Sequence, residues 1–268
     1  MTTAAVQAPA RVRATGGRRY RQILWLLTTR DLRVRYSTSA LGYLWSILDP
    51  LVMAGIYWFV FTQVFQRQVG EEPYIVFLLS ALLPWMWFNG AVSDATRAFL
   101  REAKLVRSTK IPRTIWVNRL VLSKGIEFLL SIPVLAAFAI VSGASLTAGV
   151  ALLPLALLMQ AVLTAGVGLI VAPLVVFFRD LERAVKLILR FLFYASPIIY
   201  SARDLPEGLH AWAAFNPLFG LFSLYRSSFF GSEFDPYLVG VGAAMSVALL
   251  AIGLLVFART ERAVLKEI

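Results

Sequence analysis

Long apolar stretches, separated by short basic or polar segments, dominate the chain. The first runs over residues 41–65 and carries a single charge, Asp49. At a rise of roughly 1.5 Å per residue, a helix of that length crosses a bilayer. Comparable stretches follow, so the predicted spans cover about 41–65, 73–93, 115–142, 148–178, 184–200 and 237–257. This pattern predicts an all-α membrane protein with six transmembrane helices.

The segment before the first span, residues 18–36, has a different pattern. Its apolar positions recur at helical spacing among arginines: Ile23, Leu26, Leu27 and Leu32. That spacing is typical of an amphipathic helix lying in the membrane surface. Residues 1–17 contain arginines but no apolar core, which is not the pattern of a signal peptide. We expect a disordered cytosolic tail over 1–17 and one transmembrane domain over 18–268.

A less regular stretch, residues 201–232, separates the fifth and sixth predicted spans. Prolines and glycines cut it into apolar pieces of about ten residues: the interruptions are Pro206, Gly208, Pro217, Gly220 and Gly231. Pieces that short do not cross a bilayer, and broken helices at membrane depth need protein or water to cover them. We predict one or two short re-entrant or interfacial helices here, and the alternative is two ordinary loop turns.

Composition and charge agree with a membrane location. Only 15% of the residues are charged and 59% are hydrophobic, whereas a soluble domain is about a quarter charged. The net charge of +11 does not indicate nucleic acid, because the basic residues are sorted by side. With the N-terminus inside, only three of the 26 lysines and arginines lie in outer loops: Arg67, Arg203 and Arg226. The positive-inside rule therefore predicts a multi-pass membrane protein with both termini cytosolic.

No cluster of catalytic or metal-ligating residues is visible in the sequence. There is no cysteine, and the single histidine, His210, lies beside Trp212 in the irregular stretch, where an interfacial role is commoner than a catalytic one. No GxxxxGK[ST] run occurs, so the chain lacks the usual loop for ATP phosphates. These features disfavour an enzyme, and we expect no cofactor on this chain.

Few ionisable residues fall inside the predicted spans, and their cost in a membrane makes each a functional candidate. Asp49, followed by Pro50, marks either a flexible, hydrated point beside a pathway or a carboxylate paired with a neighbouring helix. Glu127 is either part of a gate or, as we favour, extends toward the cytosol beside Lys124. So few buried charges argue against a proton- or sodium-driven mechanism.

Aromatic residues are dense in the first and fifth predicted spans. Tyr57, Phe61 and Phe65 recur every four residues and therefore share one helix face. Phe191 and Tyr194 lie close together in the fifth span. Aromatic faces offer apolar area that suits the C–H faces of sugars. The alternative is an ordinary interfacial belt combined with helix packing.

Six segments occur in an order that is more specific than any one of them: LGYLWSILDPL, KLVRSTKIPR, EFLLSIPVL, FFRDLERAV, SPIIY and NPLFGLFSLYR. Together they resemble the permeases of ABC-2-type polysaccharide exporters, the Wzm and TagG kind, from about Tyr20 to the C-terminus. The resemblance implies a half-transporter of six spans. It also implies a homodimer working with two copies of a separate P-loop ATPase subunit, which holds the ATP and Mg.

The resemblance also assigns roles to two groups of residues. The first inner loop and a second contact would seat on the ATPase: Arg101, Lys104, Leu105, Val106, Arg107, Ile111, Pro112, Arg113, Arg179 and Asp180. A helix from Arg101 would place its basic positions at i, i+3 and i+6. The first and fifth spans would line the substrate pathway through Trp45, Asp49, Tyr57, Phe61, Phe65, Phe191 and Tyr194. Without the resemblance, a solvated, lipid-facing patch explains the basic loop equally well.

The implied cargo is a lipid-linked polysaccharide moved from the cytosol to the outer face. The Ala- and Arg-rich composition indicates a high-GC bacterium, so we expect the chain in a bacterial plasma (inner) membrane. In such an organism a cell-wall galactan is favoured as the cargo over O-antigen or teichoic acid. One alternative is an ABC-2 exporter of a small amphipathic drug or lipid. Others are an intramembrane glycosyl- or acyltransferase, and a channel or scaffold without an energy source.

Overall fold

The computed structural model describes residues 16–37, 44–64, 70–109 and 111–268, and regular structure within these ranges is helical. The longer helices are α1 Gly16–Ser37, α2 Trp45–Trp58, α3 Tyr74–Ala95, α5 Ile115–Val141, α6 Leu153–Phe177, α7 Leu181–Ala195 and α10 Pro236–Glu267. The shorter ones are α4 Ala103–Ser108, α8 Glu207–Ala213 and α9 Pro217–Arg226. The all-α prediction is therefore confirmed.

Four helical segments in the described part of the chain are long and apolar enough to cross a membrane: α3, α5, α6 with the turn before it, and α10. Each coincides with a predicted span, and α10 continues ten residues beyond the predicted end, to Glu267. The predicted tail is shorter than expected, because α1 already begins at Gly16; residues 1–15 lie outside the described part.

The first and fifth predicted spans hold shorter helices. α2 runs directly into a π-helical segment, Phe59–Val64, and the rest of the first span, residues 41–43 and 65, lies outside the described residues. α7 is amphipathic and has 15 residues. It ends five residues before the predicted boundary because Pro197 disfavours a helical conformation at Ser196, which is extended at φ −113° and ψ 152°.

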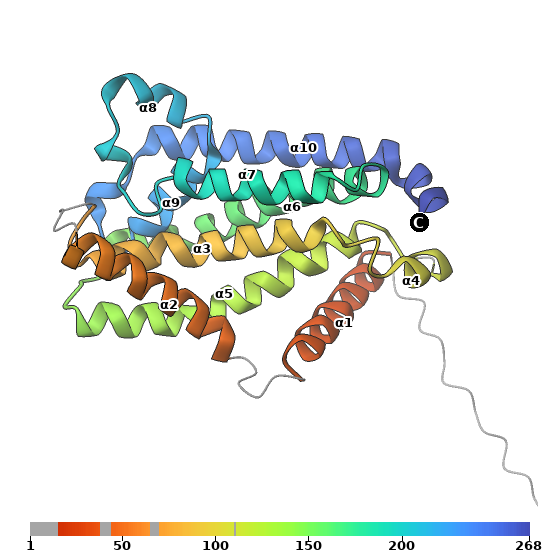
Figure 1. Cartoon of the computed structure of the whole chain (residues 1–268), viewed down its shortest axis with the longest axis horizontal. Coiled ribbons are helices and arrows are strands. Elements are labelled where there is room, and N and C mark those ends of the chain that lie inside the picture. The colour runs from red at the N-terminus through yellow and green to blue at the C-terminus, as the bar shows by residue number, and fades with distance from the viewer. Residues whose placement is uncertain (1–15, 38–43, 65–69, 110) are drawn as a thin grey trace, which may run out of the picture.

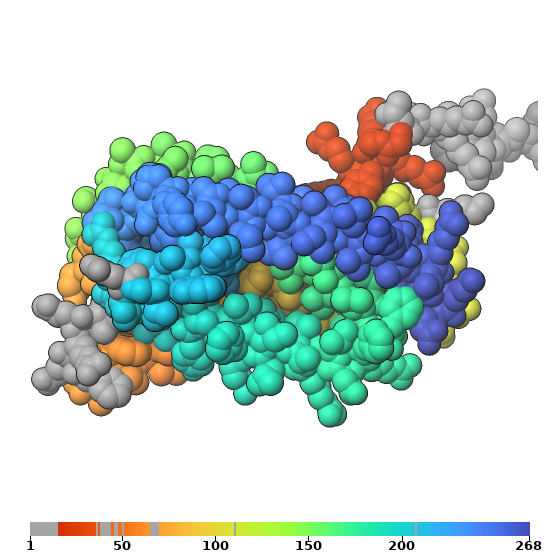
Figure 2. Space-filling model, turned by 90° about the horizontal axis from the view of Figure 1, so that it is seen from above, coloured from red at the N-terminus to blue at the C-terminus, as the bar shows by residue number. Residues whose placement is uncertain are grey.

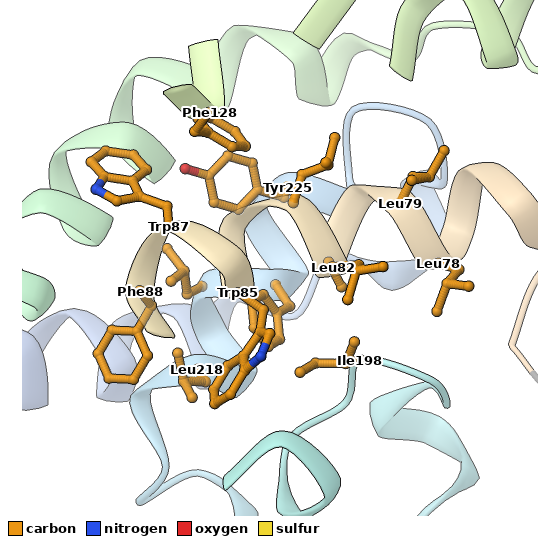
Figure 3. Packing of buried hydrophobic residues seen from close by; sticks show 14 of the residues in the cluster. Leu78, Leu79, Leu82, Trp85, Trp87, Phe88, Phe128, Ile198, Leu218 and Tyr225 are labelled. Carbon is orange, nitrogen blue, oxygen red and sulfur yellow. The ribbon is translucent and has the colours of Figure 1, made fainter. Parts of the chain in front are cut away.

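α3 is the centre of the core. Figure 3 shows its side chains pointing both ways: Trp87 toward Phe128 and Tyr225, and Trp85 toward Leu218 on the other side. The Trp87 and Phe128 rings lie 5.5 Å apart, and the Trp87 indole N–H donates to the backbone oxygen of Val121 at 2.9 Å. A helix that is apolar all round is expected to be covered by others, and α3 is.

Figure 1 shows the long helices side by side, with α1, α4 and the C-terminus at one end and α8 and α9 at the other. α5 ends in a tight turn at Gly143, whose φ of +72° favours glycine. Two short helices, α8 and α9, occupy the stretch predicted to contain them; α9 is buried, whereas α8 is largely exposed. Figure 2 shows α7 exposed along its length on the face that also carries α10.

Candidate functional site

A groove of about 510 Å³ lies between α2, α3 and α7. Its lining comes from one face of each helix. The lining residues are Met53 and Tyr57 on α2, Leu82, Trp85, Met86, Asn89 and Ser93 on α3, and Lys186, Leu189, Arg190, Phe193 and Tyr194 on α7. The spacing of three to four residues on α3 and α7 is what a single helix face presents.

The groove is polar at one end and aromatic at the other. α3 and α7 run in opposite directions, so Asn89 and Ser93 near the end of α3 meet Lys186 and Arg190 of α7. This polar half lies toward the end of the molecule that carries α4 (Figure 1). The helices therefore place two cations and two neutral polar groups at one mouth of the groove.

Phe193 organises the aromatic half. Its ring stacks on Tyr57 at 5.7 Å and meets Trp85 edge-on at 5.6 Å and Tyr194 edge-on at 5.0 Å. Phe193 is buried while Tyr194 is exposed, so Phe193 forms the floor and Tyr194 the rim. Such a cluster offers weak, apolar contact along a surface rather than a tight pocket.

The structure brings together only part of the predicted pathway. Tyr57 and Tyr194 line the groove, and the Phe61 ring lies 6.5 Å from the Tyr57 ring, as their shared helix face predicts. Phe191 does not line the groove but lies with Leu187 and Ile188 in an exposed apolar patch. This patch adjoins the groove, because Arg190 and Tyr194 line both.

Two other residues predicted to line the pathway do not line the groove, and a third cannot be placed. Trp45 and Asp49 are exposed on α2 but are not among the groove's lining residues, and Phe65 lies outside the described part of the chain. The sequence analysis missed Trp85, Asn89, Lys186 and Arg190. A signal for two of them was available in the sequence. Lys186 and Arg190 are spaced i, i+4 at the start of the predicted span 184–200, and ionisable residues inside a span are functional candidates.

Glu182 connects the groove to the turn after α3. Its carboxylate accepts a hydrogen bond from Lys186 Nζ at 2.6 Å and pairs with the guanidinium of Arg97, which follows α3. Hydrogen bonds from Arg97 and Lys186 lower the pKa of Glu182 to about 2. The carboxylate is therefore ionised at physiological pH, and it joins α7 to the loop after α3.

The predicted coupling loop contains a helix shorter than expected. α4 begins at Ala103, so Arg101 precedes it rather than opening it. Val106 is fully buried, with Leu105 and Ile111 packed against the same cluster. Lys104 and Arg107 are exposed on α4.

The C-terminal end of α10 lies against this loop, a contact that the sequence did not indicate. Arg107 donates to the backbone oxygen of Ile268 at 2.9 Å, and Arg113 lies 4.0 Å from Glu261. Pro112 is exposed, as are Arg179 and Asp180 in the turn before α7. Contact of these residues with an ATPase stays a prediction.

Ion pairs attach α1 to the same end of the molecule. Asp31 accepts from Arg119 at 2.9 Å, Arg35 pairs with Asp94 at 2.7 Å, and Arg30 pairs with Glu102 just before α4. These residues line a polar cavity of about 430 Å³. Leu27 and Leu32 are buried beneath them, whereas Leu26 is exposed.

The expected pairing of Glu127 is also present at this end. Glu127 accepts from Lys124 at 2.7 Å and from Arg35 at 3.1 Å. A carboxylate held by two cations contributes to the attachment of α1 to α5.

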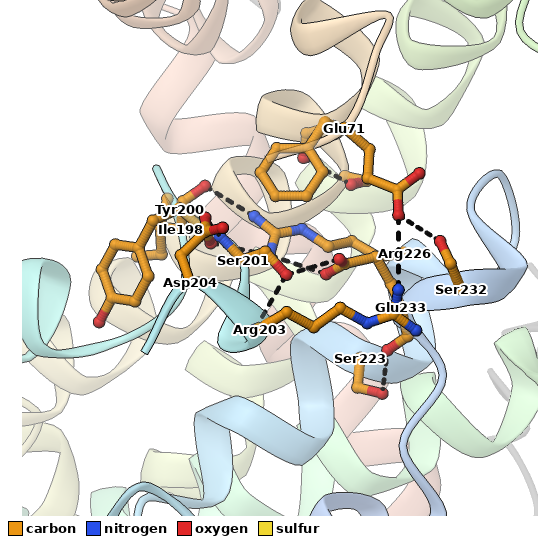
Figure 4. A network of polar contacts seen from close by, with 12 residues as sticks. Glu71, Ile198, Tyr200, Ser201, Arg203, Asp204, Ser223, Arg226, Ser232 and Glu233 are labelled. Carbon is orange, nitrogen blue, oxygen red and sulfur yellow. Dashed lines mark hydrogen bonds and ion pairs between the residues drawn. The ribbon is translucent and has the colours of Figure 1, made fainter. Parts of the chain in front are cut away.

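A buried network holds the opposite end together (Figure 4). Arg226 donates to the backbone oxygens of Ile198 at 2.9 Å and Tyr200 at 3.1 Å, and its guanidinium lies 3.5 Å from Glu233. The same guanidinium sits 3.5 Å from the centre of the Phe77 ring. One arginine therefore ties the segment after α7 to α9 and α3.

Comparison with known proteins shows which family the sequence matches. The sequence matches the ABC-2 type transporter family over residues 22–230. It is 34% identical over 236 residues to the O-antigen export system permease protein RfbA of Klebsiella pneumoniae, with 88% of this chain and 90% of that protein covered. RfbA of Myxococcus xanthus is 30% identical over 234 residues, with 86% and 89% covered. The polysialic acid transport protein KpsM of Escherichia coli is 25% identical over 248 residues, with 89% and 93% covered.

The family match covers most of the helical region, and the relatives align over most of their own length. Both findings confirm the resemblance seen in the six sequence segments and the prediction of a transport protein rather than an enzyme. The chain belongs to the ABC-2 type transporter family.

Proposed function

We propose that this chain is the transmembrane subunit of an ATP-driven exporter that moves a lipid-linked polysaccharide from the cytosol to the outer face. The groove between α2, α3 and α7 is the single observation that carries the proposal. It combines a basic, polar mouth with an aromatic wall, which suits a cargo with a charged head and a sugar chain. Relatives named as O-antigen and polysialic acid transport proteins support the same cargo class.

The membrane topology in this proposal has six spans with both termini cytosolic. α2 and its π-helical continuation supply the first span, and α7 with the segment up to Tyr200 supplies the fifth. α1 lies at the cytosolic surface, α8 is interfacial, and α9 is a re-entrant helix that the neighbouring helices cover. The basic residues around α1 and α4 support this orientation.

Energy comes from a separate ATPase subunit, present in two copies beside a permease homodimer. The exposed face of α4 and the turn before α7 supply its docking surface, through Lys104, Arg107, Pro112, Arg179 and Asp180. ATP binding closes the ATPase pair, which moves the inner loops as levers and switches the groove between two packings. The Arg97–Glu182 pair transmits that movement from the first inner loop to α7.

Charge reversal on α4 tests the docking surface. The permease is co-expressed with its P-loop ATPase subunit, and co-purification and export are measured. Lys104→Glu should reduce co-purification strongly. Arg262→Glu makes an equal charge change at an exposed position near the C-terminal end of α10, and it should not reduce co-purification. Equal loss in both variants, or no loss in Lys104→Glu, contradicts the assignment.

A second variant separates docking from energy transfer. Replacing Ile111 and Pro112 should uncouple ATP hydrolysis from export while membrane insertion is retained. Ile111 packs partly into the cluster beneath α4, whereas Pro112 is exposed, so Pro112→Ala isolates the surface contribution. Full export by the double variant contradicts the proposed coupling role.

The identity of the glycan is tested by deleting the gene. The Ala- and Arg-rich composition indicates a high-GC bacterium, for which a cell-wall galactan is the favoured cargo. The relatives named RfbA favour an O-antigen instead. Analysis of cytosolic lipid-linked glycans in the deletion strain distinguishes the two. Accumulation of neither, with loss of resistance to an amphipathic drug, supports the drug-exporter alternative.

A further inference from the structure

Two basic side chains line the groove, and their positive charge favours binding of an anionic ligand. Lys186 and Arg190 lie one helical turn apart on α7, and both line the groove with Asn89 and Ser93 of α3. A cation at membrane depth is costly unless it is paired or functional. Lys186 is paired with Glu182, whereas Arg190 has no carboxylate partner in the part of the chain that the structure describes.

The local balance of charge is positive. Glu182 is the carboxylate at this mouth and is shared between Lys186 and Arg97. Asp94, which is next to Ser93, is paired with Arg35 of α1 at 2.7 Å. Glu182 therefore faces two cations, Arg97 and Lys186, while Arg190 lies one turn farther along the groove.

The chemistry of the two groups favours phosphate. A guanidinium binds phosphate oxygens through two parallel N–H donors, and an ammonium adds a point charge beside it. The Asn89 amide and the Ser93 hydroxyl supply neutral donors at the same mouth. A carboxylate ligand would use fewer of these donors.

The remaining lining requires an amphiphile. Met53, Met86 and Leu189 are apolar groups level with or beyond the cations, and the aromatic cluster around Phe193 follows them. A ligand with a phosphate head at Arg190 would therefore have an apolar or sugar portion against these side chains.

We infer that Lys186 and Arg190, with Asn89 and Ser93, form a binding site for the phosphate or diphosphate group of a lipid-borne cargo. The inference deepens the proposed function and rests on it, because it names the group by which the lipid-linked cargo is first bound. The site lies at the inner mouth, so the charged group binds before the rest of the cargo reaches the aromatic wall.

Farnesyl diphosphate is the probe that tests the site. The full-length permease is placed in nanodiscs of phosphatidylcholine, which is zwitterionic, and binding is measured by titration calorimetry. Arg190→Gln should weaken binding about tenfold or more, the effect of losing a charged hydrogen bond. Arg183→Gln, an equal charge loss on the same helix but outside the groove, should leave the affinity unchanged. Farnesol, which has no phosphate, should not bind.

Several outcomes overturn the assignment. Equal weakening by Arg190→Gln and Arg183→Gln would show general attraction, and unchanged binding in Arg190→Gln would show that the site is elsewhere. Displacement of the probe by phosphatidylglycerol in the disc would show a site for bulk lipid headgroups instead. If Arg190→Gln does not fold, Lys186→Gln and Arg190→Lys decide. The first removes one of the two charges, and the second keeps both charges but loses the parallel guanidinium donors, so each should bind with intermediate affinity.

This result is separable from the test of the proposed function. A chain that exports glycan but binds farnesyl diphosphate independently of Arg190 loses only the present inference. A chain that neither co-purifies with an ATPase nor changes the glycans of its cell loses the proposed function, whatever it binds.

Discussion

At the scale of single residues, Arg226 is the clearest case of a charge retained in the protein interior. Its side chain is 1% exposed, and Glu233 beside it is 4% exposed. Two backbone oxygens of the segment after α7 depend on its guanidinium. Removing the arginine would leave a buried carboxylate and two unpaired carbonyl groups, which is costlier than the pair is stabilising.

Arg226→Met should therefore destabilise the protein by about 3 kcal/mol or more. The measured quantity is the free energy of unfolding in detergent. It is obtained from the loss of monodisperse protein as the denaturant concentration rises. Arg203→Gln is the control, because the Arg203 side chain is 59% exposed and lies 3.9 Å from Glu71. A surface pair of that kind contributes less than about 1 kcal/mol. Equal effects of the two substitutions would contradict the central role of Arg226.

At the scale of helices, α6 and α10 cross through two glycines. A Cβ built on Gly253 would lie 2.5 Å from the backbone oxygen of Gly166, and one on Gly166 would lie 2.6 Å from the backbone nitrogen of Leu250. In a membrane, helices gain little from the hydrophobic effect, so close backbone approach at small residues carries the packing. This crossing holds the last helix, and with it the C-terminus, against the core.

Gly253→Ala should consequently lower the thermal stability of the protein, although alanine is the better helix former by about 1 kcal/mol. Gly240→Ala is the matched control on the same helix, since a Cβ there has no neighbouring atom within 4 Å. That substitution should leave the melting temperature unchanged or raise it. The prediction is wrong if the two alanines have the same effect.

Helix positions were predictable where apolar length alone decides them. α3 and α5 begin and end within a few residues of the predicted spans, and so does α6 together with the 3₁₀ turn before it. The end of α7 at Ala195 was also readable, from Pro197, but hydropathy obscured it. Partners distant in sequence, such as the glycines of α6 and α10, leave no periodic signal.

The same limit applies to the candidate site. Tyr57 and Tyr194 were identifiable because aromatic residues recur on a helix face. Phe191 does not line the groove, and hydropathy alone does not say which side of α7 faces α3. Arg190 and Asn89 are recognisable as groove residues only once the packing of α3 against α7 is known.

At the scale of the whole molecule, a chain of ion pairs joins the turn after α3 to the groove. Arg97, Glu182 and Lys186 connect the end of α3 to the first two turns of α7. The lowered pKa of Glu182, about 2, means that this link is intact above the ordinary value of 4.5. It weakens only as the pH falls from 4.5 toward 2. Its strength should therefore not vary between pH 6 and pH 8.

Glu182→Gln should reduce export more than ATP hydrolysis, because α7 loses its charged connection to the loop after α3. The assay compares glycan export with ATP hydrolysis in vesicles that contain the permease and its ATPase. Glu261→Gln removes a weaker pair, 4.0 Å from Arg113, at the same end of the molecule and should change neither rate by much. Parallel loss of export and hydrolysis in Glu182→Gln would point to loss of ATPase docking instead.

The proposed homodimer can be tested on apolar surfaces that a single copy leaves uncovered. α7 exposes Leu187, Ile188 and Phe191 in the apolar patch that adjoins the groove. In a two-fold dimer, a residue close to the axis meets its own copy. The chain has no cysteine, so cysteines can be introduced singly into the natural sequence. A disulfide requires Cα atoms within about 7 Å, which makes oxidation a sensitive measure of distance to the axis.

Oxidising membranes that contain Leu187→Cys, Ile188→Cys or Phe191→Cys should convert at least one variant largely to a covalent dimer. Val247→Cys on α10 is the control, because Val247 is also well exposed, at 61%, but belongs to a helix that α6 already covers on one side. If the α10 cysteine is linked and the α7 cysteines are not, the two copies meet through α10. The groove would then open to lipid rather than toward a second copy, and the two-copy channel would have to be abandoned in favour of one pathway in each chain.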